Sequence, residues 1–265
     1  MPVVTNRGVD LRYEAADADA AVESEARSTV AFVNPVGYGA WVWGWQHAAL
    51  AGTYDTLVWD LPGTGESGPV DDPLTVRDLV GHFEAVLADC AVANAHVVGA
   101  GLGGMVALEH ARRYDRVDSL ALFGTTADGG RVDADALDSL FAPPDDPAGL
   151  RGSLGGAFAA DPADHPEVVA DIVDWRAAED ADREGFAAQA AAMTGYAADP
   201  LYEVTVPARV FHGVDDAVVP ADAGRDLAAD LPRGEFRAVE GGHLCFVEES
   251  AAVNDALVGF LDEFE

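Results

Sequence analysis

The sequence predicts an α/β fold with a mostly parallel central sheet flanked by helices. Short β-branched runs alternate with longer segments in which apolar residues recur every three or four positions, a pattern typical of consecutive βαβ units. Several runs are almost entirely apolar, as central strands buried on both faces should be. With 265 residues, 49% of them hydrophobic, the chain is long enough for one large domain with an insertion.

The alternating pattern defines the predicted elements. Strands are expected at 9–15, 29–34, 54–61, 95–100, 117–124, 208–213 and 234–239. Helices are expected at about 41–51, 75–90, 103–114, 221–231 and 249–263, where apolar residues have helical spacing. The last helix follows acidic residues, which a helix N-terminus favours.

One stretch interrupts the alternation. Residues 127–199 contain no convincing strand, are rich in Ala, Asp, Gly and Pro, and include helical segments such as EVVADIVDWRAAED. We therefore expect a helical insertion at 127–199 between two strands of a core formed by 1–126 and 200–265.

The net charge is −32, from 47 acidic and 15 basic residues, and every basic residue is arginine. Such a surface repels nucleic acid and anionic lipid. Binding of cations or basic partners is one interpretation. A solvated surface suited to high salt is the favoured one, because the acidic residues are spread along the whole chain. The composition is haloarchaeal-like, typical of a salt-accumulating microbe.

Other features bound the location and chemistry of the protein. We find no apolar run of about 18 residues and no secretory signal pattern, so no membrane span and a cytoplasmic location are expected. Cys90 and Cys245 match no zinc spacing. We therefore expect no metal site and assign both cysteines to apolar packing.

The segment VVGAGLGGMVALEHARRY, starting at Val97, has the layout of a nucleophile elbow. In this G-x-S-x-G turn, a strand leads through a sharp bend into a helix. Gly101 stands at the serine position. GAGLGG also matches the dinucleotide motif G-x-G-x-x-G, but it lies beyond the first βα unit and no acidic residue closes a strand about 20 residues later.

Two further segments follow in the order expected for that elbow. HGVDDAVVP (212–220) supplies a carboxylate after a strand, and GGHLCFVEES (241–250) supplies a histidine after the next strand. The order elbow, Asp, His resembles that of the α/β-hydrolase family. FVNPVGYGAWVWGWQ is similar to the family's oxyanion segment and DLPGTGES to its Asp-x-x-Gly-x-Gly-x-Ser loop, and 127–199 lies where the family carries its cap.

This resemblance to esterase- and lactonase-like members implies roles for particular residues. Asp216, three residues after Gly213 and followed by Pro220, would orient His243. Backbone N–H groups of Val36 and Leu102 would form the oxyanion hole. The implied ligand is a small molecule, and no cofactor is implied.

The sequence departs from the family at two places. Gly101 has no atom that can attack a carbonyl, so an acyl-enzyme cannot form there. Asn34-Pro35 replaces the usual His-Gly, which removes one N–H but leaves that of Val36. Among substitute nucleophiles, Cys245 is assigned to packing, and we find no base spaced to activate Ser67 or Thr125.

Other candidate residues carry weaker signals. Trp41 and Trp45 share a helix face and would either line a pocket for an apolar ligand or pack in the core. The remaining histidines match no motif and are expected to be surface or structural residues: His47, His82, His96, His110, His165 and His212.

Three functions are compatible with this pattern. The first is weak, water-based hydrolysis of an ester or lactone through His243 and Asp216. In the second, Gly101 is a natural or engineered Ser-to-Gly replacement that inactivates an esterase. The third is a non-catalytic pseudo-hydrolase that binds a small molecule. The sequence specifies neither the substrate nor the oligomeric state.

If the acidic surface is adapted to salt, the melting temperature should rise between low salt and molar KCl, because screening relieves the repulsion among surface carboxylates. Calorimetric or circular-dichroism melting curves measure this. An unchanged melting temperature would contradict the adaptation.

Overall fold

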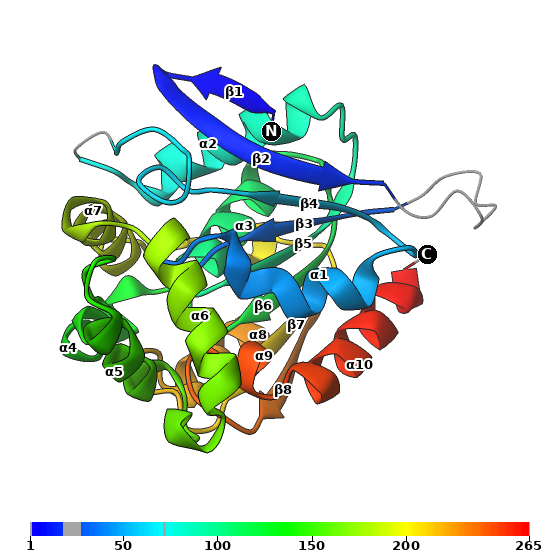
Figure 1. The fold of residues 1–265 in the computed structure, drawn as a ribbon. Coiled ribbons are helices and arrows are strands. Elements are labelled where there is room, and N and C mark those ends of the chain that lie inside the picture. The colour runs from blue at the N-terminus through cyan, green and yellow to red at the C-terminus, as the bar shows by residue number, and fades with distance from the viewer. Residues whose placement is uncertain (1, 18–27, 71–72, 265) are drawn as a thin grey trace.

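The protein is described by a computed structural model that covers residues 2–17, 28–70 and 73–264. Its centre is an eight-stranded sheet (Figure 1). The order across the sheet is β1 (Val3–Asn6), β2 (Val9–Ala16), β4 (Asp55–Trp59), β3 (Thr29–Val33), β5 (Ala95–Ala100), β6 (Val117–Phe123), β7 (Ala208–Gly213) and β8 (Gly234–Val239). The pairs β1–β2 and β2–β4 are antiparallel, and β4 to β8 are parallel.

Helices cover both faces of this sheet. Helices α1 (Gly44–Leu50) and α10 (Ser250–Leu261) lie on one face, and α2 (Val76–Asp89), α3 (Leu102–Arg113) and α8 (Ala221–Asp230) lie on the other (Figure 1). The α2 helix begins with a capping box in which the side chains of Thr75 and Asp78 each accept the other's backbone N–H. None of the helices in the described ranges is long and apolar enough to cross a membrane.

The predicted fold class is confirmed. Each predicted strand and helix is present within a few residues of its expected bounds, except that the first predicted helix is a 3₁₀ turn (Ala40–Trp43) followed by α1. The sequence analysis missed β1, a four-residue edge strand with no buried side chain. Such a strand has too few alternating residues to give a periodic signal.

The insertion expected between two core strands lies between β6 and β7. Its described residues form α4 (Ala134–Asp138), α5 (Pro147–Ala157), α6 (Pro166–Glu179) and α7 (Arg183–Thr194), with one 3₁₀ turn before α4 and another between α5 and α6. These helices gather at one end of the sheet (Figure 1), where the loops that follow the parallel strands also lie. We call residues 127–199 the cap. Its treatment as a unit separate from the core stays a prediction.

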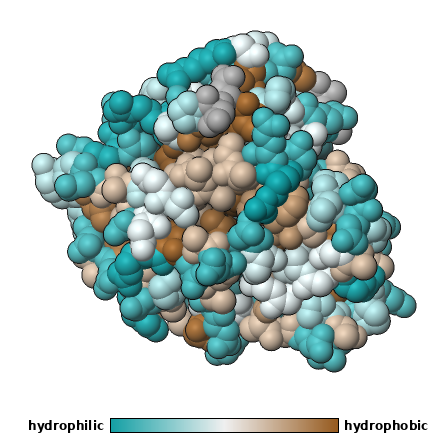
Figure 2. Space-filling model, turned by 90° about the vertical axis from the view of Figure 1, so that its left-hand side faces the viewer, coloured by the Kyte–Doolittle hydropathy of each residue, from teal (hydrophilic) through white to brown (hydrophobic). Residues whose placement is uncertain are grey.

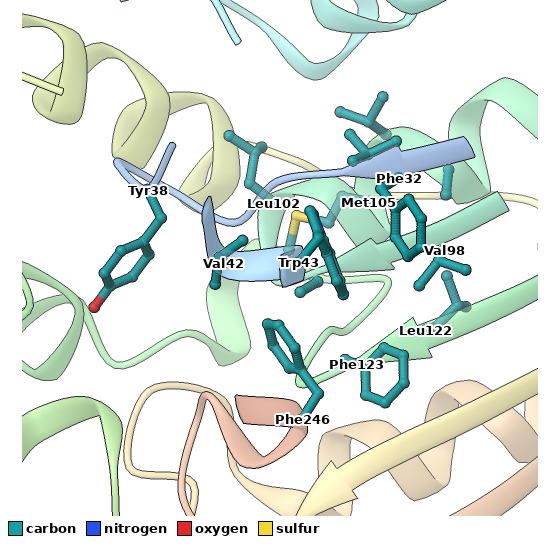
Figure 3. Close-up of a cluster of buried hydrophobic side chains, with 14 of the residues drawn as sticks. Phe32, Tyr38, Val42, Trp43, Val98, Leu102, Met105, Leu122, Phe123 and Phe246 are labelled. Carbon is teal, nitrogen blue, oxygen red and sulfur yellow. The ribbon is translucent and has the colours of Figure 1, made fainter. Parts of the chain in front are cut away.

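An aromatic cluster joins the loop after β3 to the loop after β8. The ring of Trp43 stacks on Phe246 at 4.6 Å between centroids and packs against Phe32 at 5.2 Å. Figure 3 shows these rings around Met105 and Leu102 of α3. The indole Nε1 of Trp43 donates to Asn34 Oδ1 at 3.0 Å. The core therefore holds together the loops that carry the predicted site residues.

Helix α3 lies unusually close to the sheet because glycines remove the side chains between them. A Cβ atom on Gly103 would lie 2.0 Å from the carbonyl oxygen of Val33, and one on Gly99 would lie 2.4 Å from the carbonyl oxygen of Gly103. Neither distance is compatible with a methyl group.

Replacing Gly103 by Ala should therefore destabilise the fold by about 3 kcal/mol or more, because α3 must move away from β3. Urea denaturation measures the loss. The matched control is Gly44→Ala, in a helix where a Cβ meets nothing within 4 Å. That variant should stay within about 1 kcal/mol of the wild type. Equal stability of both variants would contradict the close approach.

Candidate active site

Gly101 occupies the turn between β5 and α3. Its φ of 50° and ψ of −115° lie in a region that side chains strongly disfavour, which is the strained geometry of a nucleophile elbow. Its N–H donates to the carbonyl of Phe123 at 2.9 Å, and its carbonyl accepts from Thr125 Oγ1 at 2.7 Å. Residues on and after the neighbouring strand β6 therefore fix this turn.

Asp216 and His243 form a buried hydrogen-bonded pair. His243 Nδ1 lies 2.9 Å from Asp216 Oδ2. The N–H groups of Val218 and Val219 both donate to Asp216 Oδ1 at 2.9 Å. The carboxylate is thus held in one orientation by the loop after β7, and the imidazole is held by the carboxylate.

The pair is electrostatically stabilised. Burial alone would raise the pKa of the Asp216 carboxyl. The charge of His243 and hydrogen bonds from His212 and His243 outweigh burial and hold this pKa well below its ordinary value. Asp216 is therefore ionised at neutral pH, and it favours a proton on the Nδ1 atom of His243.

His243 also faces the elbow. A Cβ atom built on Gly101 would lie 3.3 Å from His243 Nε2 and 3.6 Å from the Cβ atom of Pro35. The structure thus brings together Gly101, Asp216 and His243, three residues far apart in the chain. A side chain at position 101 would therefore point toward His243 Nε2, whereas the other ring nitrogen, Nδ1, faces Asp216.

The two residues expected to supply oxyanion donors are buried near the same turn. Leu102 is the first residue of α3, so its N–H has no carbonyl partner within the helix. Val36 belongs to the loop after β3, which is held on both sides. On one side, Asn34 Nδ2 donates to the carbonyl of Trp59 at 3.3 Å, and on the other Gly37 N donates to Gln189 Oε1 at 2.7 Å.

His212 is a site neighbour that the sequence analysis missed. It was expected to be a surface or structural residue, and it lies fully buried with Nε2 at 3.3 Å from Asp216 Oδ2 and 2.8 Å from the carbonyl oxygen of Val219. A histidine directly after the apolar pair Val210 and Phe211 in the strand ARVFHG is the signal that could have found it, because a polar group in a buried strand needs a partner.

The remaining histidines are placed as the sequence analysis expected, as surface or structural residues. His165 is exposed, His47 is half-buried, and three are buried: His82, His96 and His110. In the described ranges, no group of three His, Cys, Asp or Glu residues could hold a metal ion.

None of the substitute nucleophiles is activated. Cys245 is fully buried, and burial raises the pKa of its thiol far above the ordinary value. The hydroxyl of Ser67 donates to the carbonyl of Asp60 at 2.8 Å. Thr125 donates to Gly101, as described above. Each group is thus engaged in packing or in a backbone hydrogen bond.

Trp41 and Trp45 pack against the cap. Both rings contact Trp175 of α6, at 6.3 and 5.9 Å between centroids, and Trp41 Nε1 donates to Asp180 Oδ1 at 2.8 Å. These contacts favour the packing alternative over a ligand pocket. That Trp41 and Trp45 line a ligand pocket stays a prediction.

Comparisons with known proteins bear on this geometry. The model of the family described as "Alpha/beta hydrolase family" matches residues 30–256. This chain belongs to the alpha/beta hydrolase family.

Relatives of this alpha/beta hydrolase include a protein named "Putative carbamate hydrolase RutD" from Variovorax paradoxus. It is 30% identical over 223 residues, which cover 81% of this chain and 84% of the relative. A solved structure of an enol-lactonase from Burkholderia xenovorans LB400 is similar with a TM-score of 0.85 and 24% identity, covering 98% and 100% of the two chains. A solved hydrolase from Pseudomonas aeruginosa PA01 has a TM-score of 0.83 and 26% identity, covering 98% and 97%.

The cap of this alpha/beta hydrolase is hydrogen-bonded to both halves of the candidate site. Glu248, five residues after His243, accepts N–H groups from Gly242, Ala159 and Ala160 at 2.6, 2.8 and 2.9 Å. The second connection is to the loop after β3, residues 34–43, which we call the oxyanion loop after its counterpart in the family. There, Glu179 Oε2 accepts a hydrogen bond from Trp41 N at 2.9 Å. Figure 2 views the molecule from the side on which α7 lies, and there hydrophobic residues form a band bordered by hydrophilic ones.

Carboxylates are crowded where the cap meets the oxyanion loop. Burial raises the pKa of Glu179, the hydrogen bond from Trp41 N opposes it, and the charges of Asp60 and Asp180 raise it further. Burial also raises the pKa values of Asp60 and Asp180. Arg12 lies 3.3 Å from Asp60 and partly compensates this negative charge.

Removing the charge of Glu179 should change the pH dependence of stability. Because its folded pKa is raised, the stabilisation by the protonated form is complete below the ordinary carboxyl pKa and is lost as pH rises through the raised value. The side chain in Glu179→Gln stays neutral at every pH. The free energy of unfolding of this variant should therefore increase relative to that of the wild type as pH rises from about 4.5 to about 7.5.

Urea denaturation at the two pH values measures that gain. The matched control is Glu184→Gln, which removes an exposed cap carboxylate and should leave the pH dependence nearly unchanged. A Glu179→Gln curve parallel to that of the wild type would show that the crowding has no energetic consequence.

Proposed function

We propose that this protein binds a small ester or lactone at Gly101 and His243 and hydrolyses it slowly by direct attack of water. The observation that carries the proposal is the 3.3 Å separation between His243 Nε2 and a Cβ built on Gly101. A serine hydroxyl would extend from that Cβ in an active member of the family. With glycine, the same direction is open to a water molecule within reach of the imidazole.

The proposed reaction needs no covalent intermediate. His243 Nε2 takes a proton from the attacking water, whose oxygen bonds to the carbonyl carbon, and Asp216 stabilises the imidazolium. The N–H groups of Val36 and Leu102 bind the resulting oxyanion. The imidazolium then returns the proton to the leaving oxygen, giving an acid and an alcohol. Residual catalysis of about 10³–10⁴ over water is the scale reached when triad members are lost.

The relatives support the substrate class. A carbamate hydrolase and an enol-lactonase are among the named proteins, and both names describe hydrolysis at a carbonyl carbon bonded to oxygen or nitrogen. We also propose that the substrate of this chain is a small molecule and that the protein is located in the cytoplasm. Nucleic acid is disfavoured as a partner because the net charge is −32.

A second candidate function is binding without turnover. One observation favours it: His243, Val36 and Leu102 expose at most 3% of their surface, so a ligand bound at these residues would be enclosed. A pseudo-hydrolase that encloses its ligand would retain this geometry.

Restoring the hydroxyl tests the descent from a serine hydrolase. Gly101→Ser should raise hydrolysis of short p-nitrophenyl esters and lactones by at least about 100-fold, because a positioned nucleophile then adds to the existing base. It should also become labelled by a fluorophosphonate. Gly101→Ala is the matched control, since it adds the Cβ without the hydroxyl, and it should gain neither property.

The native chain separates slow hydrolysis from binding alone. The double variant Asp216→Asn, His243→Ala should lose the slow turnover of the wild type and keep ligand affinity. A wild type that shows no turnover above this double variant would favour the pseudo-hydrolase. If Gly101→Ser gains neither rate nor label, the ancestry of the site in acyl-enzyme chemistry is wrong.

A further inference from the structure

A small cavity lies between the oxyanion loop and the cap. Residues from three segments line it, among them Val36, Tyr38, Leu140, Phe141, Arg176 and Phe186. Its volume is about 10 Å³, which is near the minimum that one water-sized group requires. Val36 also carries a proposed oxyanion donor, so this cavity lies beside the loop that would bind the carbonyl oxygen of a substrate.

The hydroxyl of Tyr38 is buried and has no hydrogen-bond partner among the described residues. Tyr38 exposes 2% of its surface, and its oxygen makes no hydrogen bond. In Figure 3 the ring extends away from the aromatic cluster around Trp43, with the hydroxyl at its far end. A buried hydroxyl without a hydrogen bond destabilises the folded protein, because it has lost its hydrogen bonds to water. A buried tyrosine hydroxyl without a partner therefore needs an explanation.

The neighbouring charge does not supply that partner. The guanidinium of Arg176 lies over the Tyr38 ring, with Cζ 5.0 Å from the centroid. Its Nε donates to Asp180 at 2.6 Å, and its Nη1 donates to Leu150 O and Ser153 Oγ at 2.8 and 2.7 Å. The cation is thus paired with Asp180, and its hydrogen bonds go to groups other than the Tyr38 hydroxyl.

The protonation state of Tyr38 defines what can bind. Burial raises the pKa of this phenol to about 12, so the hydroxyl keeps its proton and can both donate and accept. Arg176 is already neutralised by Asp180, so a charged ligand group would remain uncompensated. A neutral oxygen group fits these conditions.

We propose that Tyr38 is a specificity-determining residue that hydrogen-bonds a neutral hydroxyl group on the acyl side of the substrate. The preferred substrates are then esters or lactones of short hydroxy acids. This inference rests on the proposed function for the position of the carbonyl group, and it adds the substrate class.

Paired substrates test this assignment in the Gly101→Ser background. The p-nitrophenyl esters of glycolate, 3-hydroxypropanoate and 4-hydroxybutanoate are compared with those of propanoate, butanoate and pentanoate, in which a methyl group replaces the hydroxyl. Each rate is divided by the rate of alkaline hydrolysis. At least one chain length should show a preference for the hydroxylated ester in kcat/KM.

Adding Tyr38→Phe should reduce that preference about 3- to 10-fold, the scale of one hydrogen bond. The phenyl ring keeps its place beside Arg176, so hydrolysis of the alkyl esters should hardly change. Tyr202→Phe, at a residue that is 70% exposed, is the matched control and should leave the preference intact. A purely structural Tyr38 would change both ester series equally.

Binding to the native chain keeps the test independent of turnover. Benzyl 3-hydroxypropanoate should bind more tightly than benzyl butanoate in an NMR titration, and Tyr38→Phe should abolish the difference. If the wild type shows no turnover above the double variant Asp216→Asn, His243→Ala but this binding difference is present, the proposed hydrolysis fails and the Tyr38 assignment stands. If Tyr38→Phe alters neither the kinetic preference nor the binding difference, the assignment is overturned.

Discussion

The candidate site depends on the close contact between α3 and the strands beneath it. Only glycine at 99 and 103 lets the helix begin directly against the carbonyl of Val33. That approach places the first N–H of α3 beside the loop after β3 and fixes Gly101 at the carboxyl end of β5. Parallel strands bring the loops after β3, β7 and β8 to the same edge, so Val36, Asp216 and His243 meet at this turn.

The Asp216–His243 pair is stable without a nucleophile. Asp216 accepts two backbone N–H groups and contacts His243 and His212, so its charge is compensated within its own surroundings. None of these contacts of Asp216 involves a side chain at position 101. Glycine there also relieves the strain that a φ of 50° imposes on other residues. The arrangement of Asp216 and His243 therefore does not depend on which residue stands at position 101.

Much of the fold was predictable because burial imposes a period on the sequence. The apolar runs of β3, β5, β6 and β7 lie in the middle of the sheet, where both faces are covered, whereas the four-residue β1 at the edge carries no such pattern. The family resemblance implied that Asp216 orients His243, and these two side chains form a buried hydrogen-bonded pair. Tyr38, Arg176 and Glu248 escaped notice because their significance comes from contacts between the cap and the core, which sequence spacing does not encode.

The alignment of the candidate site depends on contacts between the cap and the two loops that carry His243 and Val36. Glu248 connects the His243 loop to the end of α5, and Glu179 and Asp180 hold the backbone of the oxyanion loop from the end of α6. A movement of the cap away from the core would break one or both of these connections. It would also release the loop that carries His243 or the loop that carries Val36. The positions of these two residues therefore depend on hydrogen bonds to the cap as well as on the packing of the core.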